Sequence, residues 1–331
     1  MNKLKLSALD LAQISKGTDS KIAIERSVQA AQYIESLGYE RLWYAEHHNM
    51  PYIASSATAV LIGHVAGQTK SMRIGSGGIM LPNHAPLMVA EQFGTLETLY
   101  PGRIDLGLGR APGTDQLTAM ALRRNNLNTS FYFKDDVKAL KAYFENDNPL
   151  EKVRAFPGEG LDIPIYILGS STDSAFLAAE LGLPYAFAAH FAPAQLAQAS
   201  EIYRTHFKPS AQLDKPYFIA CVNIVAAETN AEAEFLSTSL FNVFAGIITN
   251  VRRPLSPPTS EVIYAGIPEI ENAVHSMTAC TFIGDKENIL KKIAPFVAMH
   301  KVDELMTTNY IFDMDKKLAS YRLTYEAIQE A

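Results

Sequence analysis

The chain has 331 residues, 48% of them hydrophobic, so it can bury a large core and has room for one large α/β barrel or two ordinary domains. Its 29 basic and 35 acidic residues give a formal charge of −6 without a basic stripe for nucleic-acid phosphates, so nucleic acid is not an expected partner. Only Cys221 and Cys280 occur, far apart and outside a CxxC motif, which indicates neither a disulfide framework nor a thiolate metal site and suits a reducing cytoplasm.

The amino-terminal stretch MNKLKLSALDLAQ lacks the long apolar core and the small-residue cleavage site of a signal peptide. The longest uncharged runs, around 52–69 and 181–200, contain histidine or proline and are typical of buried strands and helices. No membrane segment is therefore expected, and the predicted location is the cytoplasm.

Strands and helices alternate along the chain. The hydrophobic pattern predicts strands at 4–9, 41–45, 72–80, 103–109, 163–168, 184–189, 217–226 and 304–312. Helical spacing predicts helices at 22–38, 54–68, 86–99, about 128–145, 173–182, 194–206, 230–248 and 314–329. The prediction is thus eight strands, each followed by a helix.

Eight such units in 331 residues predict an α/β fold, namely a closed (β/α)8 TIM barrel with parallel strands inside and helices outside. No linker divides the chain, so residues 1–331 are expected to form a single domain. One insertion, at about 250–271, follows the seventh repeat and contains Arg252, Arg253 and several prolines. It is expected to be either a lid over the barrel mouth or a disordered surface loop.

The active site of such a barrel lies at the carboxyl ends of its strands. The unusual residues of this chain fall at four neighbouring strand ends: Glu46, His47, His48 and Asn49; Gly75, Ser76, Gly77 and Gly78; Gly109 and Arg110; Gly169, Ser170 and Ser171. These strand ends are predicted to converge on one pocket.

A phosphate-binding site is predicted in that pocket. The segment RIDLGLGRAPG ends a buried strand in Arg110, a cation that the strand itself does not need. The next strand runs into Ser170, Ser171 and Ser174 at the start of a helix, where free backbone N–H groups and the helix dipole favour an anion. Arg110 would complete the site.

Each half of the phosphate site has a structural alternative. Ser171 or Thr172 could do no more than cap the helix. Arg110 could form an ion pair with Asp115 or Glu46. Both alternatives stay open at the level of the sequence.

Gly77 and Gly78 lie inside a predicted strand, where glycine weakens the sheet unless something approaches the backbone closely. A flat ring against the backbone would explain them, and a bulge at the barrel rim is the alternative. His47 and His48 are consecutive, so on an extended chain they point in opposite directions and cannot jointly bind a metal, and no metal is predicted. One of them should face the pocket as a general base or anion stabiliser, unless it is hydrogen-bonded under a loop.

Taken together, these residues resemble the luciferase-like flavin monooxygenases, the family of bacterial luciferase. The matching stretches are AEHHNMP, RIGSGGIMLPNHAPLMVAEQF, PGRIDLGLGRAPGTD and GSSTDSAFLAAELGLPYAFA, and the similarity extends across essentially the whole barrel. The resemblance implies FMN across the barrel mouth, with its phosphate near Arg110, Ser171 and Ser174. It also implies a non-proline cis peptide at Gly77–Gly78 beneath the isoalloxazine ring.

His47 matches the catalytic histidine of the luciferase EHH motif, and the resemblance implies the same role here. Three positions depart from luciferase. Gly109 replaces a reactive cysteine, Gly113 replaces a tyrosine, and the histidine of the PTAHP stretch corresponds to Ala85, with His84 one place earlier. These departures argue against light emission and against a long-chain aldehyde substrate, and they leave the phosphate site intact.

The activity implied is that of a monooxygenase that uses reduced FMN and O2 to oxygenate a small, partly apolar organic substrate. NAD(P)H would reduce the flavin, either in place or on a separate flavin reductase, and a homodimer is expected because relatives often pair through outer helices. The expected substrate pocket contains Phe187, His190, Phe191, Phe241 and Phe244. The alternatives are an F420-dependent hydride transferase on the same fold and a non-catalytic flavin-binding protein.

Overall fold

The computed structural model describes residues 4–111, 113–123, 129–146 and 152–329. Its strands are β1 (Lys5–Asp10), β2 (Arg41–Tyr44), β3 (Arg73–Met80), β4 (Ile104–Gly109), β5 (Ile165–Gly169), β6 (Tyr185–Phe187), β7 (Phe218–Ala226), β8 (Thr281–Gly284) and β9 (Glu304–Thr308). Its α-helices are α1 (Ser20–Leu37), α2 (Thr58–Ala66), α3 (Pro86–Leu99), α4 (Gln116–Arg123), α5 (Phe133–Phe144), α6 (Thr172–Leu181), α7 (Leu196–His206), α8 (Asn230–Ile248), α9 (Pro268–Met277), α10 (Lys286–His300) and α11 (Met314–Gln329). Three short 3₁₀ helices lie at Leu81–Asn83, Thr129–Tyr132 and Pro193–Gln195.

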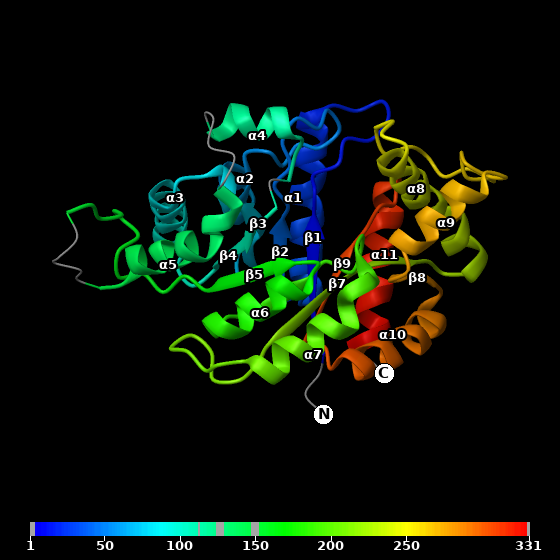
Figure 1. The fold of residues 1–331 in the computed structure, drawn as a ribbon. Helices are drawn as coiled ribbons and strands as arrows, with labels where there is room; N and C mark the ends of the chain where they lie inside the picture. The colour runs from blue at the N-terminus through cyan, green and yellow to red at the C-terminus, as the bar shows by residue number, and fades with distance from the viewer. Residues whose placement is uncertain (1–3, 112, 124–128, 147–151, 330–331) are drawn as a thin grey trace.

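Eight strands close into a parallel barrel, in the order β1-β2-β3-β4-β5-β6-β7-β9 and back to β1. Helices surround the strands, as Figure 1 shows. The predicted TIM barrel is therefore confirmed, and its eight strands correspond to the eight expected from the sequence. A ninth strand, β8, pairs with the second half of β7 outside the ring.

Four elements were not predicted from the hydrophobic pattern: α4, α9, β8 and α10. β8 has only four residues, too few to show an alternation, and α10 contains Pro295, which interrupts the signal for a helix. The predicted strand at 304–312 ends at Thr308, and the predicted helix at 128–145 is a 3₁₀ turn followed by α5. Residue 128 itself lies outside the described residues.

Alternation along β2 sets the two sides of the barrel wall. Leu42 and Tyr44 belong to the main hydrophobic core between strands and helices. Trp43 and Ala45 belong to a separate cluster in the barrel interior, where Trp43 is fully buried. Successive side chains of a strand point to opposite faces. If this alternation continues beyond β2, odd-numbered residues face the barrel interior and even-numbered residues face the helices.

A buried ionic network fills the amino-terminal end of the barrel. Arg41, at the start of β2, donates from Nε to Glu304 Oε1 of β9 (2.8 Å) and from Nη1 to Asp105 Oδ2 of β4 (2.6 Å). The same Nη1 donates to the hydroxyl of Tyr166 on β5 (2.7 Å). Both carboxylates are fully buried, and their charges outweigh the burial of Arg41 and raise its pKa. Strands β2, β4, β5 and β9 are thus tied together across the interior.

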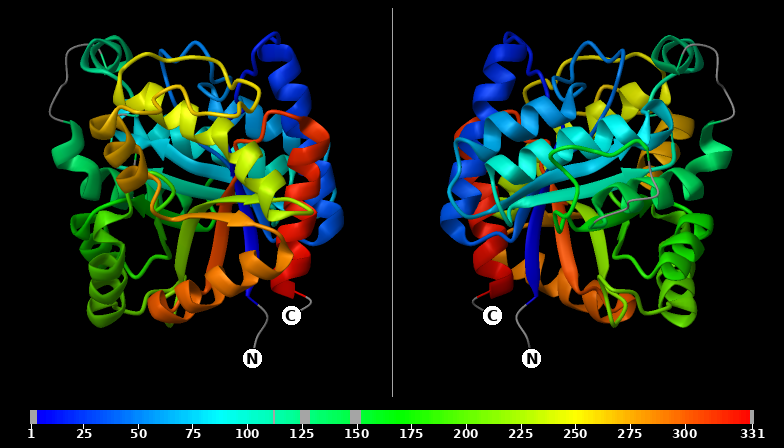
Figure 2. Two further views of the ribbon diagram at one scale, coloured as in Figure 1. Left: turned by 90° about the vertical axis from the view of Figure 1, so that its right-hand side faces the viewer. Right: turned by 90° about the vertical axis from the view of Figure 1, so that its left-hand side faces the viewer.

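The segment between α8 and α9 crosses the carboxyl end of the barrel, away from the start of β1 and the end of α11 (Figure 2). Leu255 fastens it to the loop after β1, since its N–H donates to the Ile14 carbonyl oxygen (3.1 Å) and its carbonyl oxygen accepts from the Lys16 N–H (2.7 Å). The last residues of the predicted insertion belong to α9. No helix in the described part of the chain is long and apolar enough to cross a membrane.

Candidate active site

A cavity of about 580 Å³ opens at the carboxyl ends of the strands. Its lining contains every predicted site residue: His47, Gly77, Gly78, Arg110, Ser170, Ser171 and Ser174. These residues come from the ends of β2, β3, β4 and β5, which are neighbours in the barrel. The structure thus brings the four strand ends to one pocket.

Arg110 stands at one end of the cavity with few partners of its own. Its side chain is 46% exposed, and Nη2 lies 3.4 Å from Asp173 Oδ2. The two ion pairs considered as alternatives do not form, because Asp115 accepts from Asn49 and Thr118, and Glu46 accepts from two histidines. A weak contact with an exposed carboxylate leaves most of the donors of the guanidinium available to a ligand.

The start of α6 faces the same end of the cavity. Ser171 has the extended backbone of an N-cap residue, but its side chain makes no capping hydrogen bond. Ser174 Oγ donates to the Ser171 carbonyl oxygen (2.7 Å), so the Ser174 hydroxyl is already used within the protein. Among the described residues, nothing accepts from the Ser171 hydroxyl or from the backbone N–H groups of Asp173 and Ser174. An anion at this helix start would find these donors free.

His47 continues the alternation of β2 on the side of the barrel interior and lines the cavity. Its Nδ1 lies 3.2 Å from the Gly113 carbonyl oxygen. Because a carbonyl oxygen can only accept, Nδ1 carries the hydrogen and the neutral ring has its lone pair on Nε2. Burial lowers the pKa of His47, and the nearby charge of Arg252 lowers it further. The ring is therefore neutral at pH 7, with an acceptor nitrogen.

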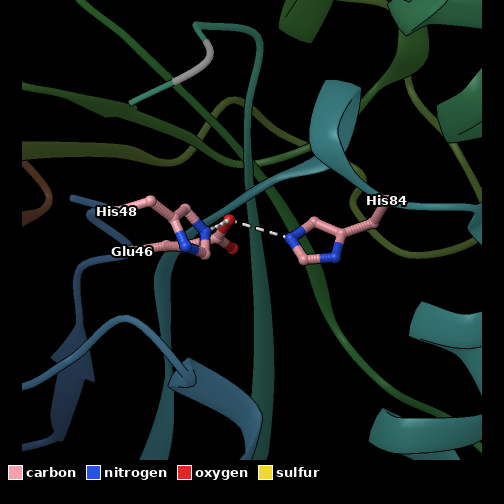
Figure 3. A group of neighbouring side chains, drawn as sticks. All are labelled: Glu46, His48 and His84. Atoms are coloured by element: carbon pink, nitrogen blue, oxygen red, sulfur yellow. Dashed lines mark hydrogen bonds and ion pairs between the residues drawn. The ribbon is translucent and has the colours of Figure 1, made fainter. Parts of the chain in front are cut away.

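Glu46 and His48 point to the opposite side from His47, and Glu46 is hydrogen-bonded to both His48 and His84, which follows β3 (Figure 3). Glu46 Oε1 accepts from the Nε2 atoms of both histidines, each at 2.8 Å, and Oε2 accepts from the Met80 N–H (3.1 Å). Burial raises the pKa of Glu46, but the bonds from His48 and His84 outweigh it and lower the pKa to about 2. The carboxylate thus ties the chain on either side of His47 to the end of β3.

The Glu46, His48 and His84 group was not foreseen from the sequence. Residues two apart on an extended chain share a face, which is the signal that could have paired Glu46 with His48. The ligand atoms of the three side chains lie within 4.8 Å of one another. Within the described part of the chain, these side chains are therefore close enough together to hold a metal ion. His47 and His48 themselves diverge, as their adjacency implies.

The Gly77–Gly78 peptide bond lines the cavity and is cis, at the position that the family resemblance implies. A Cβ on Gly77 would lie 2.7 Å from Leu9 Cδ1, and one on Gly78 would lie 2.7 Å from the Gly107 carbonyl oxygen. Glycine is therefore needed at both positions because the barrel interior and the β4 backbone leave no space for a side chain.

Gly78→Ala is expected to lower the free energy of unfolding by about 1–3 kcal/mol, because the added methyl group must push the β4 backbone away. Urea denaturation measures the effect. The matched control is Gly63→Ala in α2, where the new Cβ would meet only the end of the Leu96 side chain at 3.1 Å and alanine favours the helix. Equal stability of Gly78→Ala and the wild-type protein would contradict this account of the cavity floor.

Aromatic side chains from β6, the loop after it and α8 form a further part of the cavity wall. Phe187, Phe191 and Phe244 line it as expected, whereas Phe241 packs beside the hydrophobic cluster under α8 and α9 and is not part of the lining. His190 also lines it, is 7% exposed, and has no hydrogen-bond partner for Nδ1. Burial lowers the pKa of His190 to about 3. This part of the cavity wall is apolar and contains a neutral imidazole.

The free energy of unfolding is expected to fall as the pH drops from 6.5 towards 3, because His190 stays neutral in the folded protein while the unfolded chain takes up its proton. The loss amounts to at most about 1.4 kcal/mol per pH unit for this group. Urea denaturation at a series of pH values should show a shallower slope for His190→Asn than for the wild-type protein. The exposed His206, replaced by Asn, is the control. The same slope in His190→Asn and wild type would refute the assignment.

A family model described as luciferase-like monooxygenase matches residues 4–300. The chain belongs to the luciferase-like monooxygenase family. The resemblance inferred from the AEHHNMP and neighbouring stretches is therefore confirmed.

Individual luciferase-like monooxygenases are similar over the full length. The luciferase-like monooxygenase of Escherichia coli (strain K12) is 46% identical over 327 residues, covering 99% of this chain and 98% of the relative. The N-acetyl-S-alkylcysteine monooxygenase of Bacillus subtilis (strain 168) is 31% identical over 337 residues, covering 99% of both. The crystal structure of apo-MsnO8 is 29% identical, with a TM-score of 0.88 over 99% of each chain.

As a luciferase-like monooxygenase, the protein is an oxidoreductase that acts with molecular oxygen. Two solved structures of the same fold, each 15% identical to this chain, are a Type II Baeyer-Villiger monooxygenase in complex with FMN and an F420-dependent secondary alcohol dehydrogenase.

Proposed function

We propose that this protein binds reduced FMN and uses O2 to oxygenate a small, partly apolar organic substrate. The observation that carries the proposal is the start of α6, where the unengaged Ser171 hydroxyl and backbone N–H groups lie in one cavity lining with Arg110. Together they make a cationic, donor-rich seat for a phosphate monoester. FMN carries such a group, with a flat ring at the other end of the molecule.

The cavity residues fit FMN. Arg110, Ser170, Ser171 and the α6 N–H groups would hold the phosphate, while Ser174 would contribute its backbone N–H, since its hydroxyl is used internally. Gly77 and Gly78 offer a surface without side chains against which a flat ring can lie. Bound reduced flavin would supply the electrons that activate O2, and the protein supplies the surroundings.

The residues around the flavin would act through water exclusion and proton handling. Phe187, Phe191 and Phe244 make an apolar wall that keeps water from the reacting atoms. His47 would accept a proton or a hydrogen bond at Nε2, because the Gly113 carbonyl oxygen holds the hydrogen on Nδ1. We assign His47 the role of general base on this geometry.

A thioether is the substrate chemistry that we favour. The relative named N-acetyl-S-alkylcysteine monooxygenase is 31% identical along the whole chain, and its name describes a molecule with an alkyl-substituted sulfur. An alkyl or aryl thioether would suit the aromatic wall of this cavity. We further propose a cytoplasmic homodimer that receives its reduced FMN from a separate NAD(P)H-dependent flavin reductase.

The test combines the protein, reduced FMN from a flavin reductase, ¹⁸O2 and thioanisole as a thioether probe. The expected result is one ¹⁸O atom in the sulfoxide product and less hydrogen peroxide than without the probe. Turnover with reduced F420 in the absence of O2 would instead support the hydride-transfer alternative. Tight FMN binding with no oxygen transfer to any probe would support the flavin-carrier alternative.

A further inference from the structure

The described lining of the cavity contains three arginines, Arg110, Arg252 and Arg253, and no aspartate or glutamate. This excess of positive charge contrasts with the whole chain, in which 35 acidic residues outnumber 29 basic ones. A single phosphate at Arg110 accounts for only one of the three cations. The cavity therefore offers more positive charge than FMN alone would use.

Arg252 and Arg253 have no partner among the described residues, since neither donates to a carboxylate, a carbonyl oxygen or a hydroxyl there. Every other arginine whose side chain is described donates to a protein oxygen. Both side chains are exposed at the cavity rim, so their guanidinium donors are open to an arriving anion.

The segment that carries these arginines is fixed at both ends. Before them, the Val251 N–H donates to the Gly246 carbonyl oxygen at the end of α8 (2.9 Å). After them, Leu255 is 6% exposed and pairs through its backbone with the loop after β1. The two side chains therefore start from an ordered backbone at the cavity wall, which limits the entropy lost when they bind a ligand.

The two arginines stand across the barrel from the phosphate seat. Leu255 bridges to Ser15 in the loop after β1, and β1 lies opposite β5 in the eight-membered ring, four places away in either direction. Arg110 and Ser171, by contrast, follow β4 and β5. Arg252 is also near enough to His47 for its charge to lower the pKa of that histidine. The second group of cations therefore lies on the side of the cavity where the substrate would react.

Two further polar atoms in the same cavity lining point to a ligand. His190 Nδ1 and Ser239 Oγ are buried in side chains that are 7% and 1% exposed, both line the cavity, and neither has a hydrogen-bond partner in the described structure. Buried polar atoms without partners are costly and rare in native proteins. A substrate with polar groups along its length would satisfy them.

We propose that Arg252 and Arg253 form an anion-binding subsite and that the substrate is a small apolar molecule ending in a carboxylate. The proposal rests on the proposed function and deepens it by naming the substrate class. The planar forks of the guanidinium groups match a carboxylate, and the aromatic wall takes the apolar part of the molecule. Phosphate groups of a nucleotide offer related anionic chemistry, and the experiment separates that source from the substrate.

The experiment uses the FMN-loaded protein and two probes that differ in charge, (phenylthio)acetate and its methyl ester. Binding is followed by the change in flavin absorbance. The wild-type protein is expected to bind the acid at least about tenfold more tightly than the ester. Arg252→Ala combined with Arg253→Ala should remove that preference while the ester binds as before. The corresponding double lysine variant should keep part of the preference, since the charge remains.

The affinity for FMN distinguishes the possible failures. An unchanged FMN Kd in the double alanine variant is expected, because the phosphate seat is across the barrel. A weaker FMN affinity with an unchanged ratio of acid to ester would assign the arginines to a nucleotide phosphate and overturn the proposal. Equal binding of acid and ester by the wild-type protein, or no binding of either, would also overturn it. If FMN does not bind at all, the proposed function fails, and calorimetry with the same probes and the cofactor-free protein still tests the subsite.

Discussion

Arg110→Ala is expected to weaken FMN binding by about 1.5–3 kcal/mol, or roughly 10- to 150-fold in Kd, without unfolding the protein. The guanidinium is 46% exposed, so the loss should lie towards the lower value. Its protein contact is the 3.4 Å pair with Asp173, and the barrel therefore does not depend on it. Fluorescence titration of FMN measures the change.

Two variants accompany the Arg110 measurement. Asp173→Asn removes a negative charge beside the predicted phosphate and should tighten FMN binding by about twofold to fivefold at low salt. Arg322→Ala removes an arginine of α11 that pairs with Glu228 and Glu326 outside the cavity, and should leave the Kd unchanged. An unchanged Kd in Arg110→Ala would remove the phosphate from this end of the cavity.

His47→Ala is expected to keep FMN affinity within about a factor of two while turnover falls by about 10²- to 10⁴-fold, the usual range for loss of a general base. The ring contacts the protein through Nδ1 and the Gly113 carbonyl oxygen, so the variant loses one hydrogen bond and should still fold. Steady-state rates with a thioether probe and the FMN titration together separate binding from turnover. The exposed His64 of α2, replaced by Ala, is the control.

The pH dependence gives His47 a second signature. Burial and the charge of Arg252 lower its pKa below the ordinary 6.5, so the neutral ring persists to a lower pH than a free imidazole would allow. The rate should therefore hold as the pH falls through 6.5 and be lost only when it passes through the lower pKa of the folded protein. A rate equal to wild type in His47→Ala would show that the base lies elsewhere.

The barrel could be predicted because its elements are long and repeat one pattern. Hydrophobic strands and amphipathic helices alternate with little interruption from β1 to α8, and the capping signals agree with them. Asp19 accepts from the Ile22 N–H at the start of α1, and Gly38 ends the helix with a φ of 91°. Beyond α8 the pattern fails because β8 has four residues and α10 contains Pro295.

The candidate site could be predicted residue by residue but not in its pairings. Strand-end position identifies Arg110 and Ser171, because that property belongs to the local sequence. The bridge from Glu46 to His84 joins residues 38 positions apart, and the internal use of the Ser174 hydroxyl depends on how tightly α6 begins. Such contacts depend on tertiary packing, which cannot be derived from the hydrophobic periodicity of the sequence.

The place of Arg252 in the cavity lining was beyond prediction for a related reason. The segment between α8 and α9 has no hydrophobic period, so the sequence left open whether it covers the barrel or extends away from it. The backbone pairing of Leu255 with Ile14 decides the matter, and such a pairing between two irregular segments has no signature in either one.

The network around Arg41 bears on the order in which the protein can be completed during synthesis. Arg41 leaves the ribosome 263 residues before Glu304, the carboxylate that it needs on β9. Until then Arg41 has Asp105 as its buried counter-charge, but its Nε donor lacks an acceptor, and burying that unpaired donor would cost about 1–3 kcal/mol. The growing chain thus has a thermodynamic reason to keep this end of its interior hydrated, and the final strand supplies the acceptor that completes the buried network.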